Sequence, residues 1–501
     1  MTASPSKLEQ IAARAGDKRR AVVFLWPLLI VEIVTGVLLG LQATNQPQEY
    51  DPRVYAGEAL SVLGGDGSWL AASPHNYLYP AFLALLHNLG LWVSFNPAPV
   101  DGRFGVGVVQ IGLLYAAALF LVVVLSRCLR VRFVSAGVVV CAIAIIPAAA
   151  WSGYWLSESL AVPLLLAIIA LWVWTCHRLF LRPGSVSTLA IIFALGLASG
   201  SAWMARPALI WVPVGIALMT GLLIVASTLL LRVRNRDLGL PLPSYPWATA
   251  LFAILLIGAA LSLVPQLALD GNISHALKLD LAGQQAQGSL SVWRYATNLT
   301  GFLANRPVCG PVSVVFTPLT SDIEPIRNGL VHAPGSPIWT ISTMVAHLVS
   351  GWDPLPSPTY MSSWTAFPWI LVTLVSGFVV AGPLLACSGL VTEARSMWAG
   401  WRLRKESAVD LSRFAFVASL LGLLALFAVT EIALLRTATE FRFNVMAWLI
   451  GGACLVFLIA SGWMSRNRLV AYVGISLALS AVIFLIGQMT LDYSKYWLQC
   501  R

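Results

Sequence analysis

Runs of about 20 consecutive apolar residues recur along this chain, and a helix of that length crosses the hydrocarbon core of a bilayer. Hydrophobic residues make up 58% of its 501 residues and charged residues only 10%, which leaves too little polar surface for a soluble globule of this size. The net charge is +10, but the basic residues stand in short clusters between apolar runs. The sequence therefore predicts an all-α polytopic membrane protein surrounded by lipids, without a nucleic-acid partner.

About eleven runs are predicted to span the membrane. The first follows a basic N-terminus (residues 1–20) and is too long for a cleaved signal, so we expect it to be retained. The predicted spans are 21–43, 106–126, 133–150, 156–175, 187–204, 208–231, 246–269, 366–387, 414–433, 443–461 and 469–489.

The positive-inside rule supports this count. With the N-terminus inside, every dense basic cluster becomes cytoplasmic: 127–132, 176–183, 232–236, 393–405 and 465–468. Counting the apolar stretch 79–95 as a span would move the first of these clusters and three later ones outside. We therefore predict that 79–95 forms a helix at the outer interface, within the first outer loop.

The predicted organisation is unequal on the two sides of the membrane. A cytoplasmic N-terminus (1–20) precedes an N-terminal transmembrane module (21–269) that contains the first outer loop (44–105). A large extracytoplasmic loop (270–365), C-terminal transmembrane helices (366–489) and an outer tail (490–501) follow. Both Cys309 and Cys500 fall outside, which leaves a disulfide between them open. Any chemistry is expected on the outer side.

Charged residues from separate parts of the chain gather at the predicted outer boundary. One such charge can reach water from the boundary, but several at one depth predict a shared polar cavity. The acids are Glu49, Asp51, Glu58, Glu158 and Glu440, and the bases are Arg53, Arg206, Arg436 and Arg442.

Most of these residues also have a structural interpretation. Asp51 precedes Pro52, which is typical of a helix start, and such a helix would place Tyr55 and Glu58 on the face that follows Asp51. Glu158 fits the first turn of a span, where the helix dipole favours an acid. Arg206, before a proline, fits a turn.

Two acids fall inside predicted spans. Glu431 lies close to Arg436 in the sequence and is predicted to pair with it. Glu32 has no evident mate, so we expect it to be protonated or hydrogen-bonded to a neighbouring span.

Five stretches in order resemble the GT-C superfamily of integral-membrane glycosyltransferases, on the branch of protein O-mannosyltransferases and lipid A aminoarabinose transferases. They are "DPRVYAGEAL", "NYLYPAFLALLHNLG", "YWLSESLAVPLLLAIIAL", "LGLASGSAWMARPALIWVPVGIAL" and "EFRFNVMAWLI". The resemblance covers most of the chain. This sequence departs from it at "SES", where many members have Asp, and at "HNYLYP", where aminoarabinose transferases carry a Lys-Pro-Pro element, so the sugar and the acceptor stay open.

The resemblance implies roles for particular residues. Asp51 corresponds to the general base that acts on the acceptor, and Glu158 to the second acid of the catalytic site. Arg206 and Arg442 correspond to the residues that hold the donor phosphate, and we place Arg436 with them.

The acceptor and the rest of the substrate are expected to meet a further set of polar and aromatic side chains. Interfacial aromatics also form belts at membrane surfaces, and that interpretation remains open for the tyrosines. This set of acceptor and substrate residues comprises Arg53, Tyr55, Glu58, His75, Tyr77, Tyr79 and Glu440.

No CxxC or HExxH spacing occurs, so no dedicated metal site is predicted, although a divalent-cation requirement stays open.

The chemistry of these residue types fits such a transferase. A carboxylate can take the proton of a poorly nucleophilic hydroxyl, and guanidinium groups can stabilise a phosphate leaving group. We therefore predict an inverting transferase in a bacterial inner membrane that moves a sugar from a polyprenyl-phosphate donor to a glycan, lipid or protein outside the cytoplasm.

Two other functions stay open. A secondary transporter would show two similar halves with polar groups near the bilayer midplane. A lipid-linked oligosaccharide polymerase or ligase would use a catalytic His or Glu, and His332 and His347 in the large outer loop keep this alternative open.

Overall fold

The computed structural model contains only helices in the residues it describes, with no strand among them. The predicted all-α fold is therefore confirmed for this part of the chain, and the protein is a multi-pass membrane protein. The described residues are 7–44, 51–93 except 66, 68 and 74, 103–181 except 130, 185–237, 245–270, 366–402, 411–434, 441–460 and 468–481 except 469.

Helices lie at all eleven predicted spans. Six contain segments long and apolar enough to cross a membrane: α1 (Lys7–Thr44), α5 (Arg103–Leu129), α8 (Glu158–Leu181), α9 (Val186–Ala205), α10 (Trp211–Asp237) and α17 (Ala366–Arg402). Shorter apolar helices lie in α11 (Tyr245–Leu261), α18 (Leu411–Leu434), α19 (Phe441–Ala460) and at Val470–Ala481. The remaining span is divided into α6 (Phe133–Val140), a π-helix (Cys141–Ile145) and α7 (Ile146–Ser152).

Several helices extend beyond the predicted spans. α1 begins at Lys7 rather than at residue 21, and α17 continues to Arg402 although its span was predicted to end at 387. The reason is that hydropathy marks where a chain leaves the hydrocarbon core, whereas a helix continues until its backbone hydrogen bonding stops.

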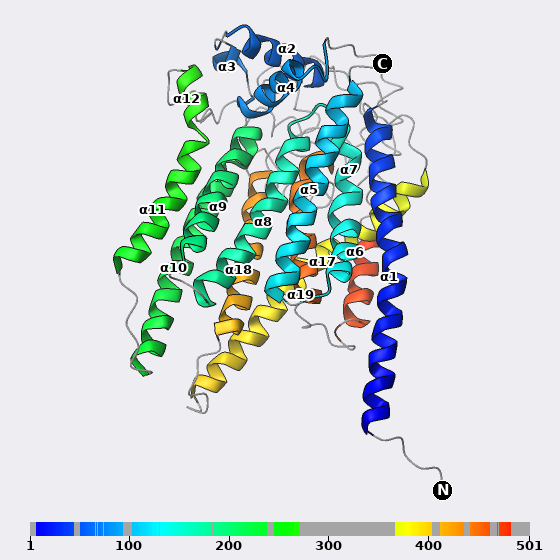
Figure 1. The fold of residues 1–501 in the computed structure, drawn as a ribbon, viewed down its shortest axis with the longest axis vertical. Coiled ribbons are helices and arrows are strands. Elements are labelled where there is room, and N and C mark those ends of the chain that lie inside the picture. The colour runs from blue at the N-terminus through cyan, green and yellow to red at the C-terminus, as the bar shows by residue number, and fades with distance from the viewer. Residues whose placement is uncertain are drawn as a thin grey trace, which may run out of the picture.

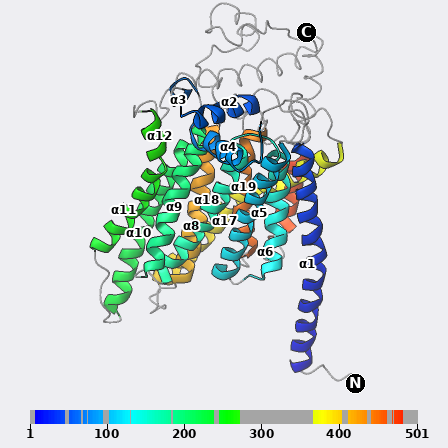
Figure 2. The ribbon, with the colours of Figure 1, turned by 45° about the horizontal axis from the view of Figure 1, so that its top comes forward.

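Three short helices cover one end of the bundle (Figures 1 and 2). They are α2 (Asp51–Leu63), α3 (Trp69–Ala72) and α4 (Leu78–Asn88). α4 has 11 residues, too few to cross the bilayer, which confirms the interfacial helix predicted within 79–95. α2 packs against α4, and α4 against α9. α12 (Val264–Asp270) reaches the same end and contacts α3.

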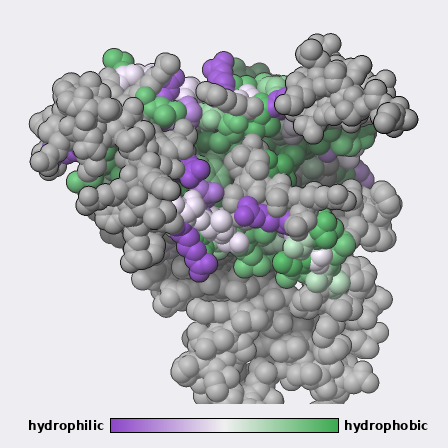
Figure 3. Space-filling view, turned by 90° about the horizontal axis from the view of Figure 1, so that it is seen from below, coloured by the Kyte–Doolittle hydropathy of each residue, from purple (hydrophilic) through white to green (hydrophobic). Residues whose placement is uncertain are grey.

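The other end of the bundle carries basic residues at helix ends. Arg127 and Arg178 lie in the last turns of α5 and α8, Arg132 precedes α6, and Arg413 lies in the first turn of α18. Figure 3 views the molecule from this end and shows hydrophilic residues among hydrophobic ones. This distribution is what the positive-inside rule requires if this end is cytoplasmic.

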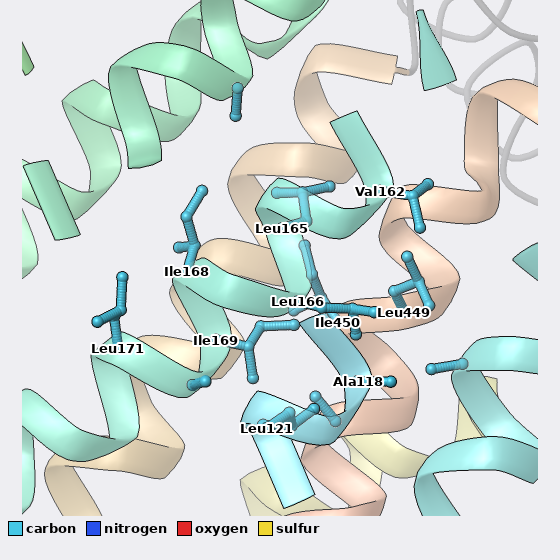
Figure 4. Packing of buried hydrophobic residues seen from close by; sticks show 14 of the residues in the cluster. Ala118, Leu121, Val162, Leu165, Leu166, Ile168, Ile169, Leu171, Leu449 and Ile450 are labelled. Carbon is cyan, nitrogen blue, oxygen red and sulfur yellow. The ribbon is translucent and has the colours of Figure 1, made fainter. Parts of the chain in front are cut away.

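The core is built around α8. Its apolar segment is 78% buried, whereas that of α1, at the edge of the bundle, is 17% buried and leaves most of its surface to lipid. Figure 4 shows Leu166 and Ile169 of α8 packed beside Leu121 of α5 and Ile450 of α19. The middle of α8 is therefore packed against neighbouring helices on several sides.

α9 and α11 approach each other closely through glycines. A Cβ atom added to Gly196 would collide with the backbone carbonyl of Leu255, and one added to Gly258 with that of Phe193. Small residues allow two membrane helices to pack with their backbones in contact. This crossing fixes α9, whose C-terminal end carries Arg206.

Gly196→Ala is expected to lower the unfolding free energy by about 1–3 kcal/mol, because the added methyl group forces apart two backbones that cannot repack. Thermal unfolding in detergent measures the change. Gly112→Ala in α5 is the control, since nothing lies within 4 Å of the added Cβ there. Equal melting temperatures for the two variants would contradict the close crossing.

Candidate functional site

A buried ion pair joins α8 to α9 at the end covered by α2, α3 and α4. Nη1 of Arg206 contacts Oε1 of Glu158, and only 7% of Arg206 and 3% of Glu158 is exposed. The hydroxyl of Ser157 lies 3.2 Å from Oε2 of Glu158 and donates to it. The two residues predicted to share an outer cavity therefore meet directly.

Local sequence explains where these two charges stand. Glu158 is the first residue of α8, where the helix dipole favours a carboxylate. Arg206 caps the C-terminal end of α9 in an extended conformation, because the following Pro207 disfavours helical geometry at the residue before it. The predicted positions of Glu158 in a first helical turn and of Arg206 in a turn are thus both compatible with a shared site.

A second polar cluster ties α2 to the segment between α3 and α4. Nδ1 of His75 lies 3.0 Å and 3.2 Å from the two carboxylate oxygens of Glu58. The Ser73 hydroxyl donates to Glu58 and accepts from the backbone N–H of His75 at 2.9 Å. Glu58 is buried, so this carboxylate holds the imidazole at the surface of the site.

Tyr55 and Tyr79 extend the cluster around Glu58. The Tyr55 ring lies 4.2 Å from the His75 ring and 4.8 Å from the Tyr79 ring. Tyr55 and Glu58 are both buried on the same face of α2, as their spacing predicted. These ring contacts join α2, the segment that holds His75 and the start of α4 into one packed unit.

Tyr79 is completely buried. Its hydroxyl donates to the side-chain oxygen of Gln110 at 2.8 Å when the Gln110 nitrogen faces the carbonyls of Ser152 and Tyr154. Burial raises the pKa of Tyr79 well above its usual value. The hydrogen bond with Gln110 lowers this pKa, and the nearby Tyr55 and Glu158 raise it to a smaller extent. Tyr79 is therefore a neutral donor that fixes α4 against α5.

Tyr77 contacts α12 and the turn before it, and its predicted role at the acceptor stays a prediction. Its backbone N–H donates to Gln266 at 3.1 Å, and its hydroxyl lies 3.5 Å from the carbonyl of Ser262. Burial raises the pKa of the Tyr77 hydroxyl. Tyr77 thus contacts the segment that leads into α12, and it has no described contact with Glu58 or Glu158.

Asn76 and Gln266 are site residues that sequence reasoning missed. Asn76 donates to the carbonyl of Trp203 at 2.8 Å, one turn before Arg206, and accepts from Gln266 at 3.1 Å. Both amides are fully buried. A neutral amide in a loop carries no spacing that reveals its partner, so only the position of Asn76 beside "HNYLYP" could have drawn attention to it.

The other predicted residues are only partly described. Arg53 is exposed on α2. Asp51 begins α2, as the Asp-Pro pair predicted, and Arg442 lies in the first turn of α19; the side chains of both lie outside the description. Arg436, Glu440, Cys309, His332, His347 and Cys500 are outside the described residues altogether.

α8 and α19 run in the same direction. Phe180, near the end of α8, lies 6.3 Å from Phe414, near the start of α18, between ring centroids. Phe416 of α18 stacks at 5.1 Å on Phe457, near the end of α19. Both helices therefore end where α18 starts, and both start at the end that carries the ion pair.

This direction places the backbone of Arg442 at the level of Glu158. α19 packs against α8, and Figure 4 shows Ile450 of α19 and Leu166 of α8 in the same part of the packed core. Each of these residues comes eight positions after the charged residue of its own helix, which is about 12 Å of helix in both cases. The first turn of α19 is thus expected at the depth of the ion pair.

Glu32, in α1, is separate from this site. It is buried, and its Oε2 accepts no hydrogen bond from a described residue, so the expected bond to a neighbouring span is absent for that oxygen within the described part of the chain. The side chain of Glu431 is not described, and its predicted pairing with Arg436 stays a prediction. Among the described residues, no group of three or more His, Cys, Asp or Glu side chains could hold a metal.

Comparison with known proteins gives similarity at the level of fold only. No protein-family model and no curated protein matches the chain. The oligosaccharyltransferase AglB of the archaeon Archaeoglobus fulgidus, in complex with an inhibitory peptide and a dolichol-phosphate, aligns with a TM-score of 0.41 at 12% identity over 93% of this chain and 56% of that chain. The apo form of the Archaeoglobus fulgidus oligosaccharyltransferase aligns with a TM-score of 0.39 at 11% identity, over 95% of this chain and 56% of that chain.

These neighbours are similar to the chain in fold alone, at TM-scores below 0.5. The chain spans little more than half of their length. Similarity at this level assigns neither a substrate nor a residue, so the function has to be argued from the site itself.

Proposed function

We propose that this protein transfers a sugar from a polyprenyl-phosphate donor to an acceptor hydroxyl on the outer face of the membrane. The observation that carries the proposal is the buried Glu158–Arg206 pair at the bundle end where α2 begins. A guanidinium held between helix ends at one end of the bundle suits a phosphate ligand.

In this proposal Arg206 and Arg442, together with Arg436, bind the donor phosphate. Their charges stabilise the negative charge that develops on the phosphate as the bond to the sugar breaks. Support for Arg442 comes from the level of its helical turn relative to Glu158, argued above from α8 and α19.

Asp51 is proposed as the general base. Its carboxylate takes the proton of the acceptor hydroxyl while the hydroxyl oxygen attacks the anomeric carbon and the phosphate departs with its electron pair. Attack opposite the leaving group inverts the configuration at that carbon. Glu58 and Tyr55, on one face of α2, and His75, which contacts both of them, are proposed to border the acceptor.

The active site is proposed to face the periplasm of a bacterial inner membrane. The basic residues at the opposite bundle end support this orientation under the positive-inside rule. The acceptor class, whether glycan, lipid or protein, is left to experiment. The polymerase or ligase alternative depends on His332 and His347, which lie outside the described residues.

The proposal is tested by incubating the purified protein in lipid vesicles with a panel of polyprenyl-monophosphate sugars. We expect one donor to be consumed in the presence of cell-envelope acceptor extract, with release of polyprenyl phosphate measured by mass spectrometry. Vesicles without protein are the control. Consumption of no donor in the panel, together with no binding of polyprenyl phosphate itself, would contradict the proposed reaction.

A further inference from the structure

We propose that Glu158 is a counter-ion that positions Arg206 and lowers the affinity of Arg206 for the donor phosphate, rather than a group that touches the reacting atoms. The inference rests on the proposed binding of a phosphate at Arg206. It assigns to the second acid of the site a role in phosphate affinity and product release.

The first reason is that both oxygens of Glu158 are already engaged. Oε1 contacts Arg206, and Oε2 accepts from Ser157 at 3.2 Å. The residue is 3% exposed and opens α8, and its carboxylate would lose its contact with Arg206 if it turned towards solvent. A carboxylate held in this way suits positioning better than proton transfer to a substrate.

The second reason is charge balance. Arg206 is buried against Glu158, and the two together carry no net charge, so the pair attracts a phosphate far less strongly than a lone guanidinium would. A phosphate that binds there must share Arg206 with Glu158, and two anions close together in a buried site repel each other. The net positive charge that favours binding then has to come from another residue, for which the first turn of α19 offers Arg442.

The consequence concerns turnover. A polyprenyl phosphate product carries the charge that the cations of the site bind, so an unopposed pair of arginines would retain it. Glu158 offers Arg206 a replacement partner as the product leaves, because their ion pair restores the buried charge balance. Glu158 therefore lowers affinity for the lipid phosphate and favours its release.

The experiment measures the Kd of undecaprenyl phosphate for the full chain in nanodiscs. Glu158→Gln is expected to bind about tenfold more tightly than wild type, equivalent to about 1.4 kcal/mol. Glu393→Gln in α17 is the control, because it removes the same charge from a half-buried position at the far end of the bundle, and its Kd should match wild type. Titration with inorganic phosphate separates a site for phosphate alone from one that also requires the lipid.

Glu158→Asp keeps the charge but draws the carboxylate back from Arg206, so it provides a second test if Glu158→Gln fails to fold. We expect binding about two- to threefold tighter than wild type. An unchanged or weaker affinity in either folded variant would overturn the counter-ion role.

The failure of this inference is distinguishable from failure of the proposed function. If wild type binds undecaprenyl phosphate and Arg206→Gln weakens that binding, the phosphate site stands whatever Glu158 does. If wild type does not bind it at all, the proposed donor site itself is wrong.

Discussion

Asp51→Asn is expected to lower sugar transfer by about 10²- to 10⁴-fold while leaving α2 in place. The loss follows because an amide cannot take the acceptor proton. The fold should survive, since Asn caps a helix about as well as Asp, and α2 is also held by Glu58 and Tyr55 through their contacts with His75. Initial rates of transfer from the polyprenyl-phosphate donor, in membranes with matched protein levels, measure the effect.

The control for this substitution is the affinity for undecaprenyl phosphate, which should be unchanged because Asp51 is not proposed to bind the phosphate. Asp51→Ala separates the two roles further. It should lose the same activity and, in addition, about 1 kcal/mol of stability from the missing cap. Wild-type transfer by Asp51→Asn would refute the assignment of the base and leave the phosphate site untouched.

Arg206→Leu is expected to be the most destabilising single substitution in the site, at about 3–5 kcal/mol. It leaves Glu158 charged and 3% exposed without the guanidinium that contacts its Oε1. It should also abolish measurable binding of undecaprenyl phosphate. Thermal or denaturant unfolding in detergent reports the first effect, and lipid titration reports the second.

The double variant Arg206→Leu with Glu158→Leu separates stability from function. Replacing both members of a buried ion pair with apolar residues is often neutral or stabilising, so this variant should regain most of the lost unfolding free energy. It should still fail to bind the lipid phosphate. Recovery of phosphate binding in the double variant would show that Arg206 is not a phosphate ligand.

Hydropathy and charge were enough to predict most of the architecture. A bilayer leaves few ways to satisfy the backbone, so an apolar run of sufficient length forms a helix whatever surrounds it. For this reason the eleven helical spans and the interfacial helix α4 agree with the sequence prediction. The start of α2 at Asp51 was also predictable, because Asp-Pro acts locally on the backbone.

The ends of the helices could be predicted less accurately from the sequence. α17 continues to Arg402 after its residues have become polar. Hydropathy reports the environment of a residue, and a helix passes from lipid into water without a change in its hydrogen bonding.

The sequence by itself determined which residues lie near the helix ends at each side of the bundle and which end of the bundle is basic, because both depend only on the order of apolar and charged residues along the chain. The tertiary structure alone decided that Arg206 meets Glu158, that His75 meets Glu58, and that Tyr77 turns towards the segment before α12. These pairings depend on how helices distant in sequence rotate and pack against one another. No local pattern specifies that rotation, since many rotations bury equally apolar faces.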